Sequence, residues 1–204
     1  VDATQKLKTL ASVGEAKGEL GDTRVRVILN KQKKTLTVQD HGIGMTAEEV
    51  DKYINQIAFS GAEEFVNKYK DNAAAIIGHF GLGFYSAYMV ADLVEIETKS
   101  YKDEPAVKWS CDGGTEYTMA DGDKAEVGTK ITLFLNEDVL EFCNQYKARE
   151  VIKKYCSFMP TEIYLSKANA PEEYETIERA DKLDTDIVVE EIHEDAKMEE
   201  KEKK

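Results

Sequence analysis

Hydrophobic and polar positions at the start of the chain predict one helix and then a β-hairpin. Apolar residues recur at helical spacing over 2–16, which predicts an amphipathic helix there. Apolar and polar residues then alternate over 24–29 and again over 35–40, and a polar turn at 31–34 separates the two stretches. Alternation on both sides of a short polar turn is typical of two antiparallel strands joined by a hairpin.

Farther along, helical and strand-like patterns follow each other without internal repeats. Thr46 and Glu49 have the spacing of a capping box, so a helix is predicted to start there and to end near Gln56. The other predicted elements are helices at 84–90 and 141–158 and strands at 93–98, 107–111, 116–119, 130–135, 162–165 and 187–192. This order predicts an α+β fold, with a mixed and largely antiparallel sheet and helices on one of its faces.

The composition changes after Lys167, where the chain becomes polar and ends in a run of glutamates and lysines. Such runs are typical of solvated linkers or tails. We therefore predict one folded domain over 1–168. The residues 169–194 are predicted to form the end of this domain or the start of a linker, and 195–204 a charged linker or tail.

Charge and cysteine content narrow the possible functions. The 204 residues carry a formal net charge of −13, which argues against a nucleic-acid partner because phosphate contacts need a basic surface. No stretch approaches the roughly 18 consecutive apolar residues of a membrane helix, so no integral membrane segment is expected. Cys111, Cys143 and Cys156 form no CxxC pair, which favours reduced thiols in a cytoplasmic protein over a zinc site.

The first candidate binding motif is Asp40-His41-Gly42-Ile43-Gly44-Met45, directly after the second predicted strand. A carboxylate at a strand end can accept a hydrogen bond from an amino group such as that of adenine. Glycines beside it let a flat ligand approach bare backbone, and Ile43 and Met45 can supply apolar contact. Taken alone, the motif is also compatible with a surface turn in which the aspartate caps a helix.

Two further motifs lie downstream. Gly78-His79-Phe80-Gly81-Leu82-Gly83 has the pattern GxxGxG before a predicted helix, where backbone N–H groups can form an anion site. No Lys-Ser/Thr pair follows, so it is not a Walker A loop, and its spacing differs from the Rossmann fingerprint. By itself it is also compatible with a flexible loop. Gly128-Thr129 opens a predicted strand with a hydroxyl, which alone indicates only an ordinary strand residue.

The three motifs, in this order, resemble the GHKL ATPases, the superfamily that joins gyrase, heat-shock protein 90, histidine kinases and MutL-type repair proteins. The segments 57–61 (IAFSG) and 77–92 (IGHFGLGFYSAYMVAD) look like the lid and phosphate-loop segments of the heat-shock protein 90 chaperones. The resemblance covers roughly 1–168 and is greatest for the bacterial HtpG type. It implies the two-layer α/β sandwich of the GHKL, or Bergerat, fold.

The resemblance also implies roles for residues that match the family's nucleotide site. Asp40 would bind the adenine amine, and Gly44 and Thr129 would join through ordered water. The segment 56–80 would form the ATP lid. The apolar residues expected near the base are Ile43, Met45, Ile54 and Ile131. The residues expected to present backbone N–H groups to the phosphates are Gly81, Leu82, Gly83 and Phe84.

Three positions in and near the lid depart from the family's pattern. Phe59 stands where the family usually has Lys, His79 stands where Gln is common, and Asn55 occupies a position that is often Gly. A charged contact from the lid to the nucleotide is therefore not expected at Phe59.

The family's catalytic helix is expected to precede residue 1. In the family, a Glu that orients the attacking water and an Asn that holds Mg²⁺ come before the Asp-Ala pair matched here by Asp2-Ala3. The chain also lacks an initiator Met, so we expect the first strand and most of the first helix to be missing. Asp2 and Lys6 are expected at the edge of the pocket. Neither the catalytic nor the metal-binding residue is in the chain, so these residues alone are expected not to hydrolyse ATP.

Together, these features predict the ATP/ADP-binding domain of a molecular chaperone, with Mg²⁺ as a further cofactor. The resemblance implies slow ATP hydrolysis in the intact protein, which would drive lid closure and clamp-like closure of a homodimer around client proteins. The 204-residue chain itself is expected to be monomeric. Two alternatives stay open: another GHKL ATPase resembling a histidine kinase, and a non-catalytic module that binds proteins through a sheet edge or the acidic tail.

Overall fold

The computed structural model describes residues 1–16, 21–56, 65, 67–68, 77–78, 82–170 and 180. The chain divides into two units, 1–170 and 171–204, and of the second unit the structure describes only Ala180. The strand predicted at 187–192 lies outside the described residues, and the domain boundaries predicted at 168 and 194 stay predictions.

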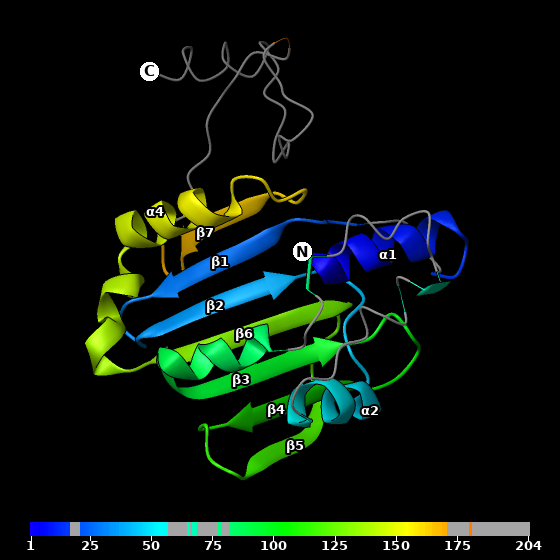
Figure 1. The fold of residues 1–204 in the computed structure, drawn as a ribbon, viewed down its shortest axis with the longest axis horizontal. Coiled ribbons are helices and arrows are strands. Elements are labelled where there is room, and N and C mark those ends of the chain that lie inside the picture. Colours follow the sequence, from blue (N-terminus) through cyan, green and yellow to red (C-terminus); the bar gives the residue numbers. More distant parts are fainter. Residues whose placement is uncertain are drawn as a thin grey trace, which may run out of the picture. The chain divides into compact units, whose positions relative to one another are not determined.

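The first unit contains one mixed sheet and several short helices (Figure 1). The strands are β1 (Val25–Asn30), β2 (Thr35–Asp40), β3 (Ala91–Lys99), β4 (Ala106–Cys111), β5 (Tyr117–Gly122), β6 (Gly128–Leu135) and β7 (Ile163–Lys167). The helical elements are α1 (Asp2–Ser12), α2 (Ala47–Val50), the π-helical turn η1 (Asp51–Asn55), the 3-10 helices η3 (Gly83–Met89) and η4 (Glu137–Cys143), and α4 (Gln145–Cys156).

The sheet has seven strands in the order β5-β4-β3-β6-β2-β1-β7. Every neighbouring pair is antiparallel except β1 and β7, which are parallel. The predicted mixed, mostly antiparallel sheet is therefore confirmed. The β2–β6 pairing matters most for function because it joins the first and the last of the three motifs, which are far apart in sequence.

One face of the sheet is apolar and carries the helices. The register aligns Val27, Val38, Ile131, Ile96 and Trp109 in one row across five strands. Side chains of successive residues point to opposite faces of a sheet, so this row and its neighbours build a single apolar surface. Figure 1 shows the helices in front of that surface, which confirms the predicted two-layer arrangement with helices on one face.

The helical layer packs on this surface in two clusters. In the first, α2 and η1 contribute Val50 and Ile54 against the β3 and β4 core, including Val94, Ile96 and Trp109. The second cluster lies under α4. Its members are Val27, Leu29 and Ala148, with Leu36, Ile152, Ile163 and Leu165 packed against them.

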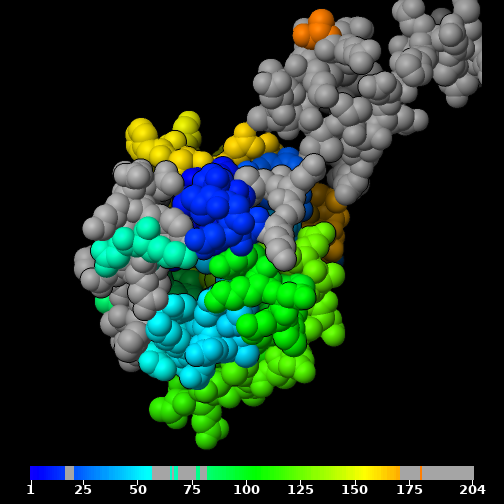
Figure 2. All heavy atoms as spheres, turned by 90° about the vertical axis from the view of Figure 1, so that its right-hand side faces the viewer, coloured from blue at the N-terminus to red at the C-terminus, as the bar shows by residue number. Residues whose placement is uncertain are grey.

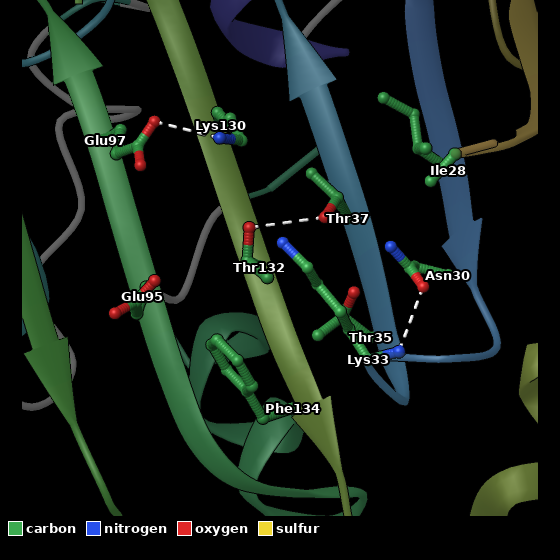
Figure 3. A pocket seen from close by; sticks show the side chains of 11 residues that line it. Ile28, Asn30, Lys33, Thr35, Thr37, Glu95, Glu97, Lys130, Thr132 and Phe134 are labelled. Carbon is green, nitrogen blue, oxygen red and sulfur yellow. Dashed lines mark hydrogen bonds and ion pairs between the residues drawn. The ribbon is translucent and has the colours of Figure 1, made fainter.

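The other face of the sheet is polar. It carries a hollow of about 270 Å³. In this hollow Lys130 pairs with Glu97 at 3.0 Å, and the hydroxyls of Thr37 and Thr132 lie 3.2 Å apart. Figure 3 shows both contacts. None of the residues predicted to contact nucleotide lines this hollow. Asp40 and Thr129 lie two residues from Val38 and Ile131 along their strands, so they share the apolar, helical face of the sheet.

Three predicted helices differ from the observed ones. Helix α1 ends at Ser12 rather than near residue 16, because Gly14 has a φ of 76° and the amides of Glu15 and Ala16 return to the Leu10 carbonyl. The helix predicted at 84–90 is the 3-10 helix η3. The helix predicted at 141–158 is wrong as one element, because Asn144 is extended and its side chain caps α4 through the Tyr146 amide at 2.9 Å.

Candidate functional site

Asp40 and Thr129 lie side by side on the helical side of the domain. Asp40 is the last residue of β2, and the register pairs it directly with Thr129 near the start of β6. The Asp40 carboxylate is half-buried, and its Oδ1 accepts a hydrogen bond from the Gly42 amide at 2.8 Å. Among the described residues no donor contacts Oδ2. A carboxylate held by one oxygen, with the other available, can accept a hydrogen bond from an amino group.

A chain of hydroxyls joins this pair to the following loop. Thr98 at the end of β3 is fully buried, and its Oγ1 accepts a hydrogen bond from the Met45 amide at 3.0 Å. The same oxygen lies 3.0 Å from Thr129 Oγ1 and 3.3 Å from the Gly128 carbonyl. Thr98 has one proton to donate. If it goes to Gly128, Thr129 donates to Thr98; if it goes to Thr129, the Thr129 proton is available to a ligand or a water molecule.

Sequence reasoning missed Thr98. The signal that was available is a hydroxyl in the inward-facing row of β3, where Val94 and Ile96 occupy the two preceding inward positions. A polar residue at the end of such an apolar row needs a buried partner. That partner is Thr129, which the sequence had singled out for another reason.

Two glycines bring backbone segments into contact around Asp40. Gly44 has a φ of 61°, and a Cβ there would lie 1.8 Å from the Lys99 carbonyl oxygen. Gly128 has a φ of 126°, and a Cβ there would lie 2.2 Å from the Asp40 carbonyl oxygen. Both positions therefore require glycine, for conformation and for space. Gly44 and Gly128 therefore let the loop after β2 pack directly against the ends of β3 and β6.

The predicted apolar contacts are only partly brought together. Met45, Ile54, Phe84 and Ile131 belong to one cluster around the β3 and β4 core. Ile43 does not belong to it. Its backbone instead ties the loop to its neighbours, because its amide donates to the Ala3 carbonyl at 3.1 Å and its carbonyl accepts from the Tyr101 amide at 2.9 Å.

The start of α2 is fixed by the predicted capping box. The Thr46 hydroxyl accepts from the Glu49 amide at 3.2 Å, and the Thr46 amide donates to the Glu49 carboxylate at 2.9 Å. Glu49 also pairs with Lys102 at 2.8 Å. The hydrogen bond to Glu49 raises the pKa of Lys102, so the ammonium stays charged in this pair. The loop between Asp40 and α2 is thereby held at both ends.

The glycine motif at 78–83 is described only in part. His79, Phe80 and Gly81 lie outside the described residues, and so does most of the segment predicted as the ATP lid, including Phe59. Leu82 and Gly83 are exposed at the start of η3. Their contact with phosphates stays a prediction.

Phe84 points into an aromatic cluster beneath η3. Its ring meets the rings of Tyr85, Tyr88 and Trp109 edge-on, with centroids 5.7 to 6.1 Å apart. Burial, followed by a hydrogen bond to Cys111, raises the pKa of Tyr88, so this phenol stays neutral and packs as an apolar ring. The edge-on contacts fix η3, and with it the end of the glycine motif, against β4.

Asn55 explains one departure from the family's pattern. Its side-chain carbonyl accepts a hydrogen bond from Trp109 Nε1 at 2.8 Å, and its amide donates to Asp51 at 2.9 Å. The Tyr85 hydroxyl also donates to the neighbouring Ile54 carbonyl at 2.9 Å. In this chain an Asn at the position often occupied by Gly therefore ties the end of η1 to β4.

The first turn of α1 borders the same loops. Figure 2 shows this end of the domain, with α1 in blue above α2 and η1 in cyan. The carboxylate of Asp2 contacts the amides of Ile77 and Gly78, and the Lys6 ammonium lies 5.4 Å from the centre of the Phe65 ring. Both residues are predicted at the pocket edge. Asp2 contacts the first glycine of the glycine motif, and Lys6 contacts a residue of the predicted lid segment 56–80.

The chain matches the family model described as "Histidine kinase-, DNA gyrase B-, and HSP90-like ATPase" over residues 19–131. It is 60% identical over 168 residues to the chaperone protein HtpG of Bacteroides thetaiotaomicron, covering 82% of this chain and 24% of that protein. It is 56% identical over 182 residues to that of Bacteroides fragilis strain 638R, covering 89% and 26%. It is 58% identical over 168 residues to that of Porphyromonas gingivalis strain ATCC 33277, covering 82% and 25%.

These matches confirm the resemblance found in the sequence. The chain spans about a quarter of the length of the curated relatives that it matches. In the part of the chain that the structure describes, no helix is long and apolar enough to cross a membrane. Because the family model covers more than half of the chain, including the Asp40 and Thr129 motifs, this chain belongs to the histidine kinase-, DNA gyrase B- and HSP90-like ATPase family.

Proposed function

We propose that this chain binds ADP and ATP on the helical side of its sheet, as the nucleotide-binding part of a chaperone ATPase. The observation that carries the proposal is the Asp40–Thr129 pair at the joined ends of β2 and β6, with one Asp40 oxygen held by the Gly42 amide. A carboxylate with one oxygen held in this way can accept a hydrogen bond from the exocyclic amine of adenine through its other oxygen.

Each residue of the site has a separate part in this proposal. The Gly42 amide holds one Asp40 oxygen, which orients the other oxygen toward the adenine amine. Thr129, supported by Thr98, supplies a hydroxyl to the base or to a bridging water. Met45, Ile54 and Ile131 offer apolar contact, while Ile43 holds the loop through its backbone. Gly81, Leu82, Gly83 and Phe84 would bind the phosphates through their amides.

Mg²⁺ would accompany the phosphates rather than occupy a cage of its own in the described residues. No group of three or more His, Cys, Asp or Glu side chains that could hold a metal gathers there. Magnesium commonly binds through one or two carboxylates or amides together with phosphate oxygens and water. We therefore assign no step to the ion.

In the whole protein we propose slow ATP hydrolysis, coupled to lid closure, homodimer closure and the folding of client proteins. The support is the family match and the naming of the relatives as chaperones. We further propose that the 204-residue chain binds nucleotide without measurable turnover. A steady-state phosphate-release assay tests this, and turnover by the chain alone would contradict it.

The Asp40→Asn variant tests the binding site. The amide keeps an oxygen for the Gly42 amide but turns an NH₂ group toward the adenine amine. We therefore expect ADP affinity to fall by about 10- to 100-fold, as for a lost hydrogen bond to a charged group. Isothermal titration calorimetry measures the change, with Asp103→Asn in the exposed β3–β4 turn as a matched control. Unchanged ADP affinity in a folded Asp40→Asn protein would refute the role given to Asp40.

A further inference from the structure

Asp2 is hydrogen-bonded to the start of the glycine motif. Its Oδ1 accepts from the Ile77 amide at 3.1 Å, and its Oδ2 accepts from the Gly78 amide at 2.6 Å. Gly78 is the first glycine of the GxxGxG pattern. One carboxylate thus binds two consecutive backbone N–H groups, an arrangement in which both bonds are charge-assisted and the geometry is specific.

The Asp2 carboxylate lies close to the Gly78 backbone. A Cβ at Gly78 would lie 3.0 Å from the Asp2 carboxylate oxygen, which is tighter than ordinary van der Waals contact. A larger residue at position 78 would require the Asp2 side chain to shift.

The next residue of α1 holds the other glycine motif. The Ala3 carbonyl accepts a hydrogen bond from the Ile43 amide at 3.1 Å, and a Cβ at Gly42 would lie 2.5 Å from Ala3. Asp2 and Ala3 are consecutive residues in the first turn of one helix. The loop that carries Asp40 and the start of the glycine motif are therefore both attached to the same rigid turn.

We propose that Asp2 is a positioning residue that fixes the start of the glycine motif relative to Asp40, and so sets the phosphate end of the site against its adenine end. The proposal rests on the proposed nucleotide function. The Asp2 carboxylate contacts the backbone at Ile77 and Gly78, and Asp2 acts through that backbone rather than on Asp40. Its loss should therefore weaken binding of the phosphates and leave recognition of the base intact.

The Asp2→Asn variant tests this in the full chain. Asparagine presents one acceptor oxygen and one NH₂ group, so it can keep one of the two amide bonds and must oppose the other. We expect the Kd for ADP to rise about tenfold, as for the loss of one charge-assisted bond, and the Kd for adenosine to change less than about twofold. Asp2→Glu, which keeps the carboxylate, should recover part of the ADP affinity. Asp103→Asn serves as the matched control.

Calorimetry with ADP and with adenosine separates the possible outcomes. A rise in the ADP Kd alone supports the proposal. Equal changes for both ligands, or no change for either, overturn it, because a merely structural role would not distinguish them. Failure of the unaltered chain to bind either ligand would instead refute the proposed function.

A second measurement examines the contact without any nucleotide. Amide hydrogen exchange, resolved residue by residue by NMR, should be faster at Ile77 and Gly78 in Asp2→Asn than in the unaltered chain. The Ile43 amide, which bonds to the Ala3 backbone, is the internal reference and should exchange at the same rate in both proteins. Equal exchange at Ile77 and Gly78 in the two proteins would overturn the proposal, whatever the binding data show.

Discussion

The hydroxyl oxygens of Thr98 and Thr129 lie 3.0 Å apart at the ends of two neighbouring strands, and both residues are buried. Because Thr98 also accepts from the Met45 amide, this contact joins β3, β6 and the loop after β2. Asp40, Thr129 and Thr98 lie side by side in one row across β2, β6 and β3. The stability of the loop and the orientation of the Thr129 hydroxyl therefore depend on the same buried hydrogen bonds.

We predict that Thr98→Val lowers the free energy of unfolding by about 1–3 kcal/mol, the usual cost of leaving a buried polar group without a partner. Valine has the same shape but removes the acceptor for the Met45 amide and the partner of Thr129. Urea denaturation measures the loss. Thr118→Val is the control. Thr118 lies on the exposed edge strand β5, and its hydroxyl pairs with that of Ser110 on β4, so its loss should cost less than about 0.5 kcal/mol. Equal losses in the two variants would contradict the prediction.

We predict that Gly44→Ala is far more destabilising than Gly14→Ala. Both glycines have a positive φ, 61° and 76°, so an alanine at either position should cost about 1–2 kcal/mol in backbone conformation. A Cβ at Gly44 would also collide with the Lys99 carbonyl, whereas no other atom lies within 4 Å of one at Gly14. The loss at Gly44 should therefore exceed that at Gly14 by about 2 kcal/mol or more.

Chemical denaturation of the two variants separates conformation from contact, because Gly14 reports the conformational cost alone. Similar unfolding midpoints for Gly44→Ala and Gly14→Ala would show that the loop and the end of β3 do not need to approach as closely as described.

We predict that Asp22 makes a pH-dependent contribution to the free energy of unfolding. Asp22 precedes β1 in sequence and accepts hydrogen bonds from Arg24 at 2.7 Å and from Arg26 at 2.6 Å. Burial alone would raise the pKa of Asp22, but the hydrogen bonds and charges of these arginines outweigh it and lower the pKa from its ordinary 3.8. A lowered folded-state pKa means that the stabilisation is complete above about pH 4 and disappears as the pH falls through the folded-state value.

Asp22→Asn should therefore lower the free energy of unfolding by about 1 kcal/mol at pH 7, a value reduced for partial solvent exposure. The difference from the unaltered chain should shrink as the pH falls below about 4. Urea denaturation series at pH 7, 5 and 3 measure it, with Asp103→Asn as the control. A difference that is constant over this range would contradict the ion-pair explanation.

The sequence predicted correctly those elements that are determined by residues close together in the chain. Alternation predicted the β1–β2 hairpin, and the spacing of Thr46 and Glu49 predicted a capping box that the structure contains. The predicted helix at 141–158 failed for a local reason that periodicity does not capture: the Asn144 side chain competes for a backbone amide and starts a new helix.

The sequence by itself therefore determined the motifs, their order and the family. The tertiary structure alone decided which of them meet. The β2–β6 register places Asp40 beside Thr129, and the β3–β6 register places Thr98 beside Thr129. Asp2, in the first turn of α1, accepts a hydrogen bond from the Gly78 amide. Periodicity reports which face of an element is buried, but register and long-range contacts depend on how those faces pack together. Contacts between residues so far apart in sequence leave no local pattern, which is why the Thr98–Thr129 and Asp2–Gly78 contacts appeared only in the folded chain.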